Sequence, residues 1–383
     1  MKSEQHPLLS ILLLSCVTYG CSNQETSHPN FVHNIEITEM LDSVAWSDLV
    51  ESMEYIPLEF KPECAIHEVE QLLVRDGHLY IRSHKDLHAF DPQGKYLYSV
   101  EHGHAKNEVI GLISANLWKD QLCLYDVSQK KEVLLDAKSG KYMDKREVNA
   151  PFGEGYQFGD HFIMDVSRVS NDATEQLRFW IWSDPKSEPA KYISYNTHNS
   201  GNVGDLSVLD DGLLYSDIAR NQVYKVSADG LTPYINVSVP KSLQMPEEVK
   251  EAIASNQYHW DNEGQYMHHL LNVQECESII AASIDMGNRF CTILYDKSSR
   301  RSLCYKMTSG WEAWMTYPGA FKASEGDNLY CVLTPNIVHL NKVLNDVSTP
   351  PSKSQFLPAY NAFMACQEDD NPIIVRFKLK HIN

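Results

Sequence analysis

Short apolar runs alternate with turn-forming residues along most of the chain, and this pattern predicts β-hairpins. The runs Leu72–Val74 and Leu79–Ile81 flank the dipeptide Asp76-Gly77. Because Asp-Gly tolerates the positive φ angles of a tight hairpin turn, the segment is expected to form two antiparallel strands. A second pair of apolar runs follows around the turn Asp91–Gly94. Two consecutive hairpins predict one four-stranded antiparallel sheet.

The same unit recurs along the chain, with an acidic residue in the turn of most copies. The turn acids are Asp76, Asp120, Asp160, Asp211 and Asp327. A further copy without such an acid lies between the last two of them, at Ser278–Ala282 and Arg289–Asp296. The repeat is therefore about 50 residues long, which is typical of a propeller blade. The sequence predicts an all-β fold, a six-bladed β-propeller of four-stranded antiparallel blades with a small helical insertion.

The insertion is expected in the longest interval between two units, which separates the fourth from the fifth. Pro246, Glu247 and Glu248 stand near the start of this stretch. Proline fits the first turn of a helix, and negative charge there stabilises the exposed N–H groups. Residues Met245–Ala254 are therefore predicted to form an inserted helix over one face of the propeller.

The sixth unit lacks a second hairpin of its own, so the two ends of the chain have to complete it. A propeller whose ring stays open would expose sheet edges on its first and last blades. The C-terminal run Ile373–Leu379 offers one apolar strand, and Met53–Glu59 offers another ahead of the first unit. We expect these two strands to pair, with Met53–Glu59 as the outer strand of blade six. Pro57 fits such an edge position, where its missing N–H is not needed.

The N-terminal segment carries the features of an export signal. The apolar run Leu8–Val17 is too short to span a bilayer but suits the core of a signal peptide. Gly20-Cys21 follows, and a small residue directly before a cysteine resembles a bacterial lipobox, although Thr18 and Tyr19 depart from its usual pattern. Cys21 is the predicted lipid-attachment site. The alternative is a plain secretory signal that is cleaved nearby, with Cys21 incidental.

These features divide the chain into three predicted parts. Residues 1–20 are a lipoprotein signal peptide, residues 21–45 are the lipidated cysteine and a flexible tether, and residues 46–383 are the propeller. The tether is inferred from the polar stretch Ser22–Asn34, which has no strong periodicity. The predicted location is the cell envelope, as an outer-membrane lipoprotein that faces the periplasm or the exterior. The lipid would make the membrane a partner.

Composition narrows the range of partners. Hydrophobic residues make up 43% of the chain, which is enough for a packed core, and the formal net charge is −18. Nucleic acid is not expected as a partner and anionic lipid surfaces are poor partners, because both require a basic patch. The acidity is interpreted as a source of solubility.

The cysteine pattern indicates packing rather than metal binding. Of nine cysteines, Cys16 and Cys21 belong to the N-terminal segment, which leaves seven. There is no C-x-x-C, and the spacings match no zinc ribbon or finger. Cys123 lies between Leu122 and Leu124, and others occupy similar apolar runs. They are interpreted as small buried hydrophobes, and the sequence leaves any disulfide pairing open.

Catalytic motifs are absent from the sequence, and one histidine pair is a candidate for metal binding. There is no G-x-S-x-G, no P-loop, no dinucleotide fingerprint and no calcium loop, so neither a catalytic residue nor a cofactor is predicted. His102 and His104 would point to the same side of a strand, as zinc ligands can. No third candidate ligand stands at a sequence spacing that is typical of a zinc site. The alternative is that the two histidines lie in a solvated loop.

Aromatic residues cluster just before the sixth unit and are candidates for ligand binding. They are Trp311, Trp314 and Tyr317. Aromatic faces stack on sugar rings and on apolar side chains, and they dominate many binding interfaces. The alternative is that they pack between blades, as large residues do in any propeller.

Four short motifs, taken in order, resemble a known family. They are Tyr55–Glu59, Phe90-Asp91 with Gly94, Asp327–Tyr330 and Asp370–Pro372. Together they are similar to the six-bladed β-propeller lipoproteins of Bacteroidales, whose blades are of the NHL-repeat type. This resemblance implies a fold and an envelope location more than an activity. Such proteins often carry a loop of the form G-x-G-P-G-E-(Y/F) after the first blade, whereas the stretch His102–Val109 of this chain has Gly103 and Glu108 but no Pro-Gly pair.

Two functions from different classes follow from these observations. The first is a ligand-binding or protein-interaction propeller whose ligand is a glycan, a peptide or an envelope protein. The alternative is a metal-dependent hydrolase or lyase with its site in the propeller channel. The resemblance implies this alternative, because some related six-bladed propellers have such an activity. His102, His104 and the abundant carboxylates motivate this alternative.

Overall fold

β-Strands account for most of the secondary structure in the computed structural model. The residues that the structure describes are 30–100, 102–105, 108–148, 153–166, 177–183, 188–193, 205–217, 221–254, 266–267, 269–286, 290–309, 321–344, 350 and 356–382.

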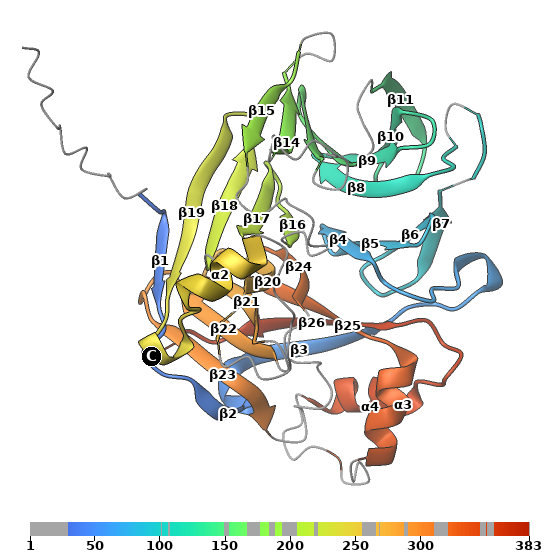
Figure 1. Cartoon of the computed structure of the whole chain (residues 1–383). Coiled ribbons are helices and arrows are strands. Elements are labelled where there is room, and N and C mark those ends of the chain that lie inside the picture. The colour runs from blue at the N-terminus through green and yellow to red at the C-terminus, as the bar shows by residue number, and fades with distance from the viewer. Residues whose placement is uncertain are drawn as a thin grey trace, which may run out of the picture. The chain divides into compact units, whose positions relative to one another are not determined.

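Within these residues the strands form six separate sheets, numbered here as blades one to six in chain order (Figure 1). Blade one contains β4 (Gln71–Arg75), β5 (His78–Ser83), β6 (Asp86–Phe90) and β7 (Tyr96–Ser99). Blade two contains β8 (Leu112–Trp118), β9 (Gln121–Asp126), β10 (Lys131–Asp136) and β11 (Tyr142–Glu147). Blade three contains β12 (Glu154–Phe158), β13 (His161–Asp165), β14 (Leu177–Trp182) and β15 (Ala190–Ile193).

The remaining blades repeat the same antiparallel order. Blade four contains β16 (Leu206–Val208), β17 (Leu213–Asp217), β18 (Gln222–Ser227) and β19 (Gly230–Ser238). Blade five contains β20 (His269–Glu275), β21 (Ile279–Asp285), β22 (Phe290–Asp296) and β23 (Ser302–Ser309). Blade six contains β24 (Phe321–Glu325), β25 (Asn328–Leu333), β26 (Ile373–Leu379) and β3 (Val50–Pro57). The predicted fold class, a six-bladed β-propeller of four-stranded blades, is confirmed.

The hairpin turns have the backbone that their sequence predicts. Asp76 and Gly77, which connect β4 to β5, have φ angles of 52° and 73°. Both angles lie in the left-handed region, which aspartate tolerates and glycine favours. The dipeptide therefore sets the tight turn between the first two strands of blade one.

The ring closes through the two strands that the sequence analysis paired. β3 runs antiparallel to β26, with Pro57 opposite Ile373 and Val50 opposite Leu379. β3 is the outermost strand of blade six, so Pro57 sits at an edge where no neighbouring strand needs its N–H. Blade six is thus built from both ends of the propeller sequence.

Two further strands lie ahead of β3, in a segment that was expected to be tether. β1 (His33–Glu36) pairs in parallel with β19 of blade four, and β2 (Leu41–Ala45) pairs in parallel with β23 of blade five. Ile35 is 2% exposed, because the strand packs its apolar side into the core. Residues 33–45 therefore add a fifth, outermost strand to blade four and another to blade five. We call these residues the N-terminal strap.

Six hydrophobic clusters hold the described part of the ring together, and each one draws on two neighbouring blades. Leu73 and Leu124, for example, belong to the cluster between blades one and two. The other clusters join blades two and three, three and four, four and five, five and six, and six and one. Because every blade packs against the next one and blade six packs against blade one, apolar burial stabilises a closed ring.

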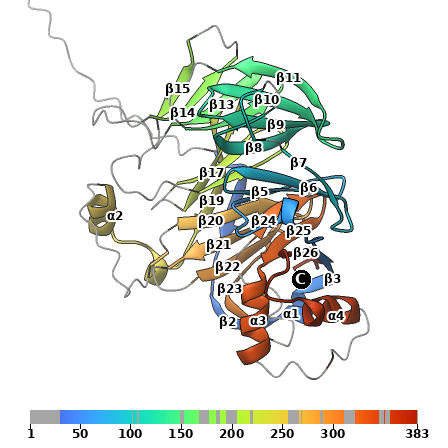
Figure 2. The ribbon, with the colours of Figure 1, turned by 90° about the vertical axis from the view of Figure 1, so that its right-hand side faces the viewer.

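Helices occur between strands. The predicted insertion forms α2 (Glu247–Ala254), between β19 and β20, and Figure 2 shows it to one side of the strands of blades four and five. The sequence analysis did not predict α3 (Pro335–Leu344) or α4 (Leu357–Ala365), which lie between β25 and β26, nor the single turn α1 (Trp46–Leu49). Ala359 and Phe363 of α4 are buried in the cluster between blades five and six.

Within the described residues, no helix has the length and apolar character that crossing a membrane requires.

The cysteines of the propeller lie in the core, as predicted. Seven are buried, at positions Cys64, Cys123, Cys276, Cys291, Cys304, Cys331 and Cys366. Burial raises the pKa of the Cys331 thiol to about 12, which keeps this side chain protonated and apolar at physiological pH.

Candidate functional site

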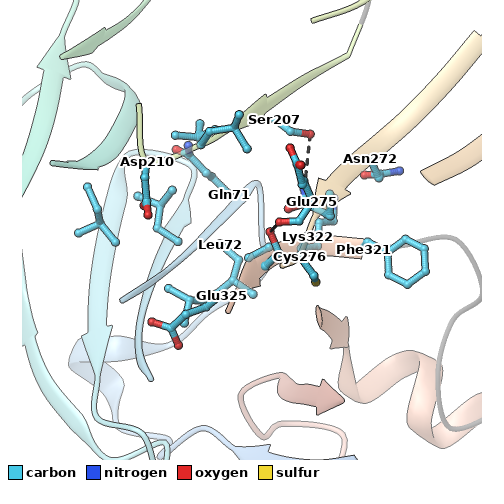
Figure 3. A pocket seen from close by; sticks show the side chains of 18 of the residues that line it. Gln71, Leu72, Ser207, Asp210, Asn272, Glu275, Cys276, Phe321, Lys322 and Glu325 are labelled. Atoms are coloured by element: carbon cyan, nitrogen blue, oxygen red, sulfur yellow. Dashed lines mark hydrogen bonds between the residues drawn. The ribbon is translucent and has the colours of Figure 1, made fainter. Parts of the chain in front are cut away.

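A cavity of about 600 Å³ lies at the inner strands of the ring (Figure 3). In each blade the first strand is the inner one, and β4, β16, β20 and β24 supply most of the lining, with Leu117 of β8. Residues from blades one, two, four, five and six therefore line a common space. This volume lies within the range of about 300–1,000 Å³ that is typical of small-molecule sites.

Side-chain amides join the inner strands of neighbouring blades around part of this space. The Gln71 side chain donates to the Ala115 carbonyl at 2.8 Å and accepts from the Ala115 N–H at 3.2 Å. Asn116 makes the same pair of hydrogen bonds with the backbone of Gln157, at 2.6 and 3.0 Å. An inner strand would otherwise present unpaired backbone groups, so these amides satisfy one edge of each sheet.

Three ion pairs occupy the lining of the cavity. Arg75 Nη2 lies 2.6 Å from Asp210 Oδ1, Lys225 Nζ lies 2.7 Å from Asp211 Oδ2, and Lys297 Nζ lies 3.0 Å from Glu275 Oε1. The first of these pairs connects blade one with blade four, which stand opposite each other in the ring. The charges of these six residues are therefore largely balanced within the protein.

Glu275 also connects the cavity wall with the N-terminal strap. The Tyr234 hydroxyl donates to Glu275 Oε2 at 2.7 Å, and His33 Nε2 of β1 lies 3.8 Å from Glu275 Oε1. Burial lowers the pKa of His33, and the negative charge of Glu275 opposes this effect. Glu275 thus has a structural role in this wall, because the side chains of His33, Tyr234 and Lys297 converge on it.

Asp205 and Lys322 form a second polar area of the lining. Asp205 stands just before β16, and its Oδ2 accepts the backbone N–H of Asn272. Burial raises the pKa of Asp205 to about 6, while this hydrogen bond and the positive charge of Lys322 oppose the rise. Within the described part of the chain, Lys322 has no acid within salt-bridge distance. It is therefore the cation of the lining that a ligand can reach without breaking an ion pair.

The structure places the histidine candidates away from this cavity. His102 and His104 lie in the segment between β7 and β8, and neither lines the cavity. His102 Nε2 is 2.7 Å from Asp86 Oδ1, and both side chains are largely exposed. Among the described residues, no group of three or more His, Cys, Asp and Glu side chains is arranged to hold a metal ion. The observed position of His102 gives no support to a metal site in the channel.

The other candidates fall outside the described residues. Trp311, Trp314 and Tyr317 lie in residues 310–320, and Cys21 lies in residues 1–29. The sequence analysis missed Arg75, Asp205, Lys322 and the rest of the cavity lining. No local signal marks Arg75, Asp205 or Lys322, because each is a single polar position in or next to an inner strand, and only the ring brings them together.

Comparison with protein families gives this propeller a place among known sequences. A family model described as "Domain of unknown function (DUF4934)" matches residues 31–378. The chain belongs to the DUF4934 family. The match starts ahead of β1, so the N-terminal strap lies within the region that defines the DUF4934 domain. No protein of curated function matches the sequence.

One solved structure supports the fold of this DUF4934 protein. This structure is of a Bacteroides fragilis protein that is described as exported on the basis of inference. Its TM-score is 0.70 at 15% identity, and the alignment covers 91% of this chain and 99% of that chain. At such low identity the likeness shows the fold alone. BamB from Moraxella catarrhalis has a TM-score of 0.29 at 10% identity, with 82% and 70% of the two chains covered. The Pan2 WD40 domain of Neurospora crassa has a TM-score of 0.37 at 10% identity, with 76% and 84% covered. These two low scores carry no argument about function.

Proposed function

We propose that this DUF4934 protein is a binding protein of the cell envelope whose ligand occupies the central cavity. The observation that supports this proposal is the cavity itself, which has a volume of about 600 Å³ and is lined by residues of five blades. Concave sites with a few convergent polar groups are the usual place for a small ligand. The loops of the ring are thus a less favoured location for the ligand than its centre.

The charges of the lining suggest the chemistry of the ligand. Four cationic side chains line the cavity, and three of them, Arg75, Lys225 and Lys297, are in ion pairs with acids of the same lining. The fourth, Lys322, is the side chain that an incoming carboxylate would neutralise. Such a charge-assisted contact is stronger than one between neutral groups. We therefore favour a polar ligand that carries a carboxylate, either an acidic oligosaccharide or an acidic peptide.

Titration calorimetry with matched probes tests this function. One pair of probes is an oligouronate and its neutral oligosaccharide counterpart, and the other is an acidic peptide and its amidated form. The protein is expected to bind the charged member of one pair and to bind the neutral member at least about tenfold more weakly, because only the charged member reaches Lys322 as an ion pair. The pair that binds identifies the ligand class.

Substitution at the cavity provides the control. Lys322→Met keeps most of the side-chain volume but removes the charge, and it should reduce the affinity for the charged probe about tenfold or more. Lys141→Ala removes an exposed lysine from the turn between β10 and β11 and should leave the affinity unchanged. Equal affinities of Lys322→Met and the unchanged protein, or no binding of either charged probe, would contradict the proposed site.

The N-terminal residues support a proposal for location. The Leu8–Val17 run and the cysteine at position 21 favour a lipoprotein of the outer membrane. The inferred export of the structurally similar Bacteroides fragilis protein is in line with this location. On this basis the protein is also a member of the Bacteroidales propeller lipoproteins that the sequence motifs resemble.

Metabolic labelling with a palmitate analogue tests the anchor. The full chain should incorporate the label and partition into detergent, whereas Cys21→Ser should do neither. Cys16→Ser is the matched control, because Cys16 lies within the apolar run and should not accept lipid. Labelling of Cys21→Ser at the original level would overturn the assignment of the lipid to Cys21.

A further inference from the structure

Three sulfur atoms meet where the N-terminal strap crosses blade five. Cys291 Sγ lies 3.4 Å from Met40 Sδ and 3.4 Å from Met286 Sδ. Met286 directly follows β21 and Cys291 is the second residue of β22, so the pairing of these two strands brings their sulfurs together. Met40 comes from the segment of the strap between β1 and β2. The cluster therefore joins two parts of the chain that are far apart in sequence.

The surroundings of the three sulfurs are apolar. Cys291 is 1% exposed and Met286 is 4% exposed, and both belong to the hydrophobic cluster between blades four and five together with Ile284 and Ile293. Met40 packs against this cluster but is only partly buried. The three sulfurs thus stand in apolar surroundings, and Met40 is the least buried of the three residues.

One thiol and two thioethers are soft ligands, which favour Cu⁺ over harder ions. We propose that Met40, Met286 and Cys291 form a binding site for a monovalent soft metal ion, Cu⁺. On binding, one bond forms between the metal and each sulfur, the Cys291 S–H bond breaks, and the proton passes to solvent. No electron is transferred, and copper enters and stays as Cu⁺.

Charge balance decides between monovalent and divalent ions. One Cu⁺ and one thiolate sum to zero, so the occupied site buries no net charge among Ile284 and Ile293. A divalent ion with the same ligands would leave one uncompensated positive charge in an apolar environment, which is strongly unfavourable. The ligand set and its surroundings therefore select a monovalent ion.

The geometry needs only a small adjustment. A metal–sulfur bond is about 2.3 Å long, so three sulfurs around one ion stand about 4 Å apart, slightly farther than they do here. Methionine has an unbranched side chain with several rotatable bonds and adapts easily to such a change. Because Met40 belongs to the strap, an ion bound here would fasten β1 and β2 to blade five.

Competition titration with Cu⁺ tests the site. The measurement uses the full chain with Cys16→Ser and Cys21→Ser, so that thiols of the N-terminal segment do not contribute, and it is made without oxygen against a chromophoric Cu⁺ chelator. We expect one equivalent of Cu⁺ to bind and to raise the melting temperature, since an ion that binds only the folded state stabilises it. Cys291→Ser should abolish this binding.

Conservative variants separate metal binding from packing. Met40→Leu and Met286→Leu keep the volume and the apolar character of each side chain but remove a ligand, and each should weaken Cu⁺ binding at least about tenfold. Met143→Leu, which changes an exposed methionine of β11, should have no effect. If the unchanged protein takes up no Cu⁺, or if the Met40→Leu/Met286→Leu double variant binds as tightly as the unchanged protein, the three sulfurs are a packing cluster and the proposal is overturned.

Discussion

Arg75 Nη2 lies 2.6 Å from Asp210 Oδ1, and the two residues belong to blades that stand opposite each other. Arg75 ends β4 and Asp210 lies in the turn between β16 and β17, so the contact crosses the space between inner strands. The Arg75 side chain also donates to the Lys119 carbonyl of blade two at 3.2 Å. One arginine thus connects three blades at the end of the cavity where the first hairpins turn.

This ion pair should contribute little to global stability. The Asp210 side chain is 87% exposed, so water screens the attraction, and a coupling free energy of about 1 kcal/mol or less is expected. A double-mutant cycle with Arg75→Ala and Asp210→Ala, followed by urea unfolding, measures this coupling. A coupling well above about 2 kcal/mol would show that the contact supports the ring rather than only bridging it.

Asp205 should make stability depend on pH in an unusual direction. Its pKa is raised by burial from 3.8 to about 6, so between these values the folded protein binds more protons than the unfolded chain. Stability from this group therefore falls as the pH rises from about 4 to about 6. Asp205→Asn removes the titration and keeps an oxygen for the Asn272 N–H.

The melting temperature at pH 4.5 and at pH 7.5 checks this prediction. Asp205→Asn should gain stability relative to the unchanged protein at pH 7.5 and show a much smaller gain at pH 4.5. Lys141→Ala, far from this carboxyl, should show no such dependence. An equal difference at both pH values would mean that the Asp205 pKa is not raised on folding.

Asp296 holds the C-terminal residues and should have the opposite dependence. It is fully buried and accepts hydrogen bonds from Ser298, Ser299, His381 and Ile382. Burial alone would raise its pKa, but these hydrogen bonds outweigh burial and lower the pKa below its ordinary value. Its contribution to stability is therefore present above the unfolded pKa of about 3.8 and is lost as the pH falls below it.

Replacement of Asp296 by asparagine tests this clamp. The loss of charge-assisted hydrogen bonds in a buried position should cost about 2 kcal/mol at neutral pH, measured by urea unfolding. The difference from the unchanged protein should shrink as the pH is lowered toward 3, because the unfolded chain then binds a proton at Asp296 that the native carboxylate does not. A constant cost over this range would contradict the lowered pKa.

Asn116 should be a strong determinant of stability between blades two and three. It is completely buried, and its amide satisfies both the N–H and the carbonyl of Gln157. Asn116→Ala leaves both groups unpaired and should destabilise the fold on the order of 3 kcal/mol in urea unfolding. Gln93→Ala, in an exposed turn, should change stability by less than about 0.5 kcal/mol. Similar effects of the two substitutions would show that water replaces the lost amide.

The blades were predictable because their signals are local. A turn such as Asp76-Gly77 specifies its own hairpin, and a repeat of such hairpins specifies the number of sheets. The pairing of β3 with β26 could be predicted from the number of strands in each unit, because the sixth unit has no second hairpin of its own. The N-terminal strap was not predicted, because β1 and β2 are single strands without a local partner, and each pairs with a strand about 200 or more residues away.

The cavity lining could not be predicted for a related reason. Arg75 and Asp210 are 135 residues apart in sequence, and each alone is an ordinary surface charge. Lys322 and Asp205 come from blades six and four, and only the closed ring brings them to one space. Polar residues that act from separate repeats carry no common pattern in the chain, whereas the apolar residues that form the repeats do.

The order of the outer strands has a consequence for how the protein reaches its final form. β1, β2 and β3 follow one another at the start of the ring, and their partners β19, β23 and β26 follow in the same order toward the end. During synthesis the earliest strands must therefore wait until the latest ones emerge. Blades one, two and three can assemble from contiguous sequence, but blade six cannot form until almost the entire polypeptide has been made.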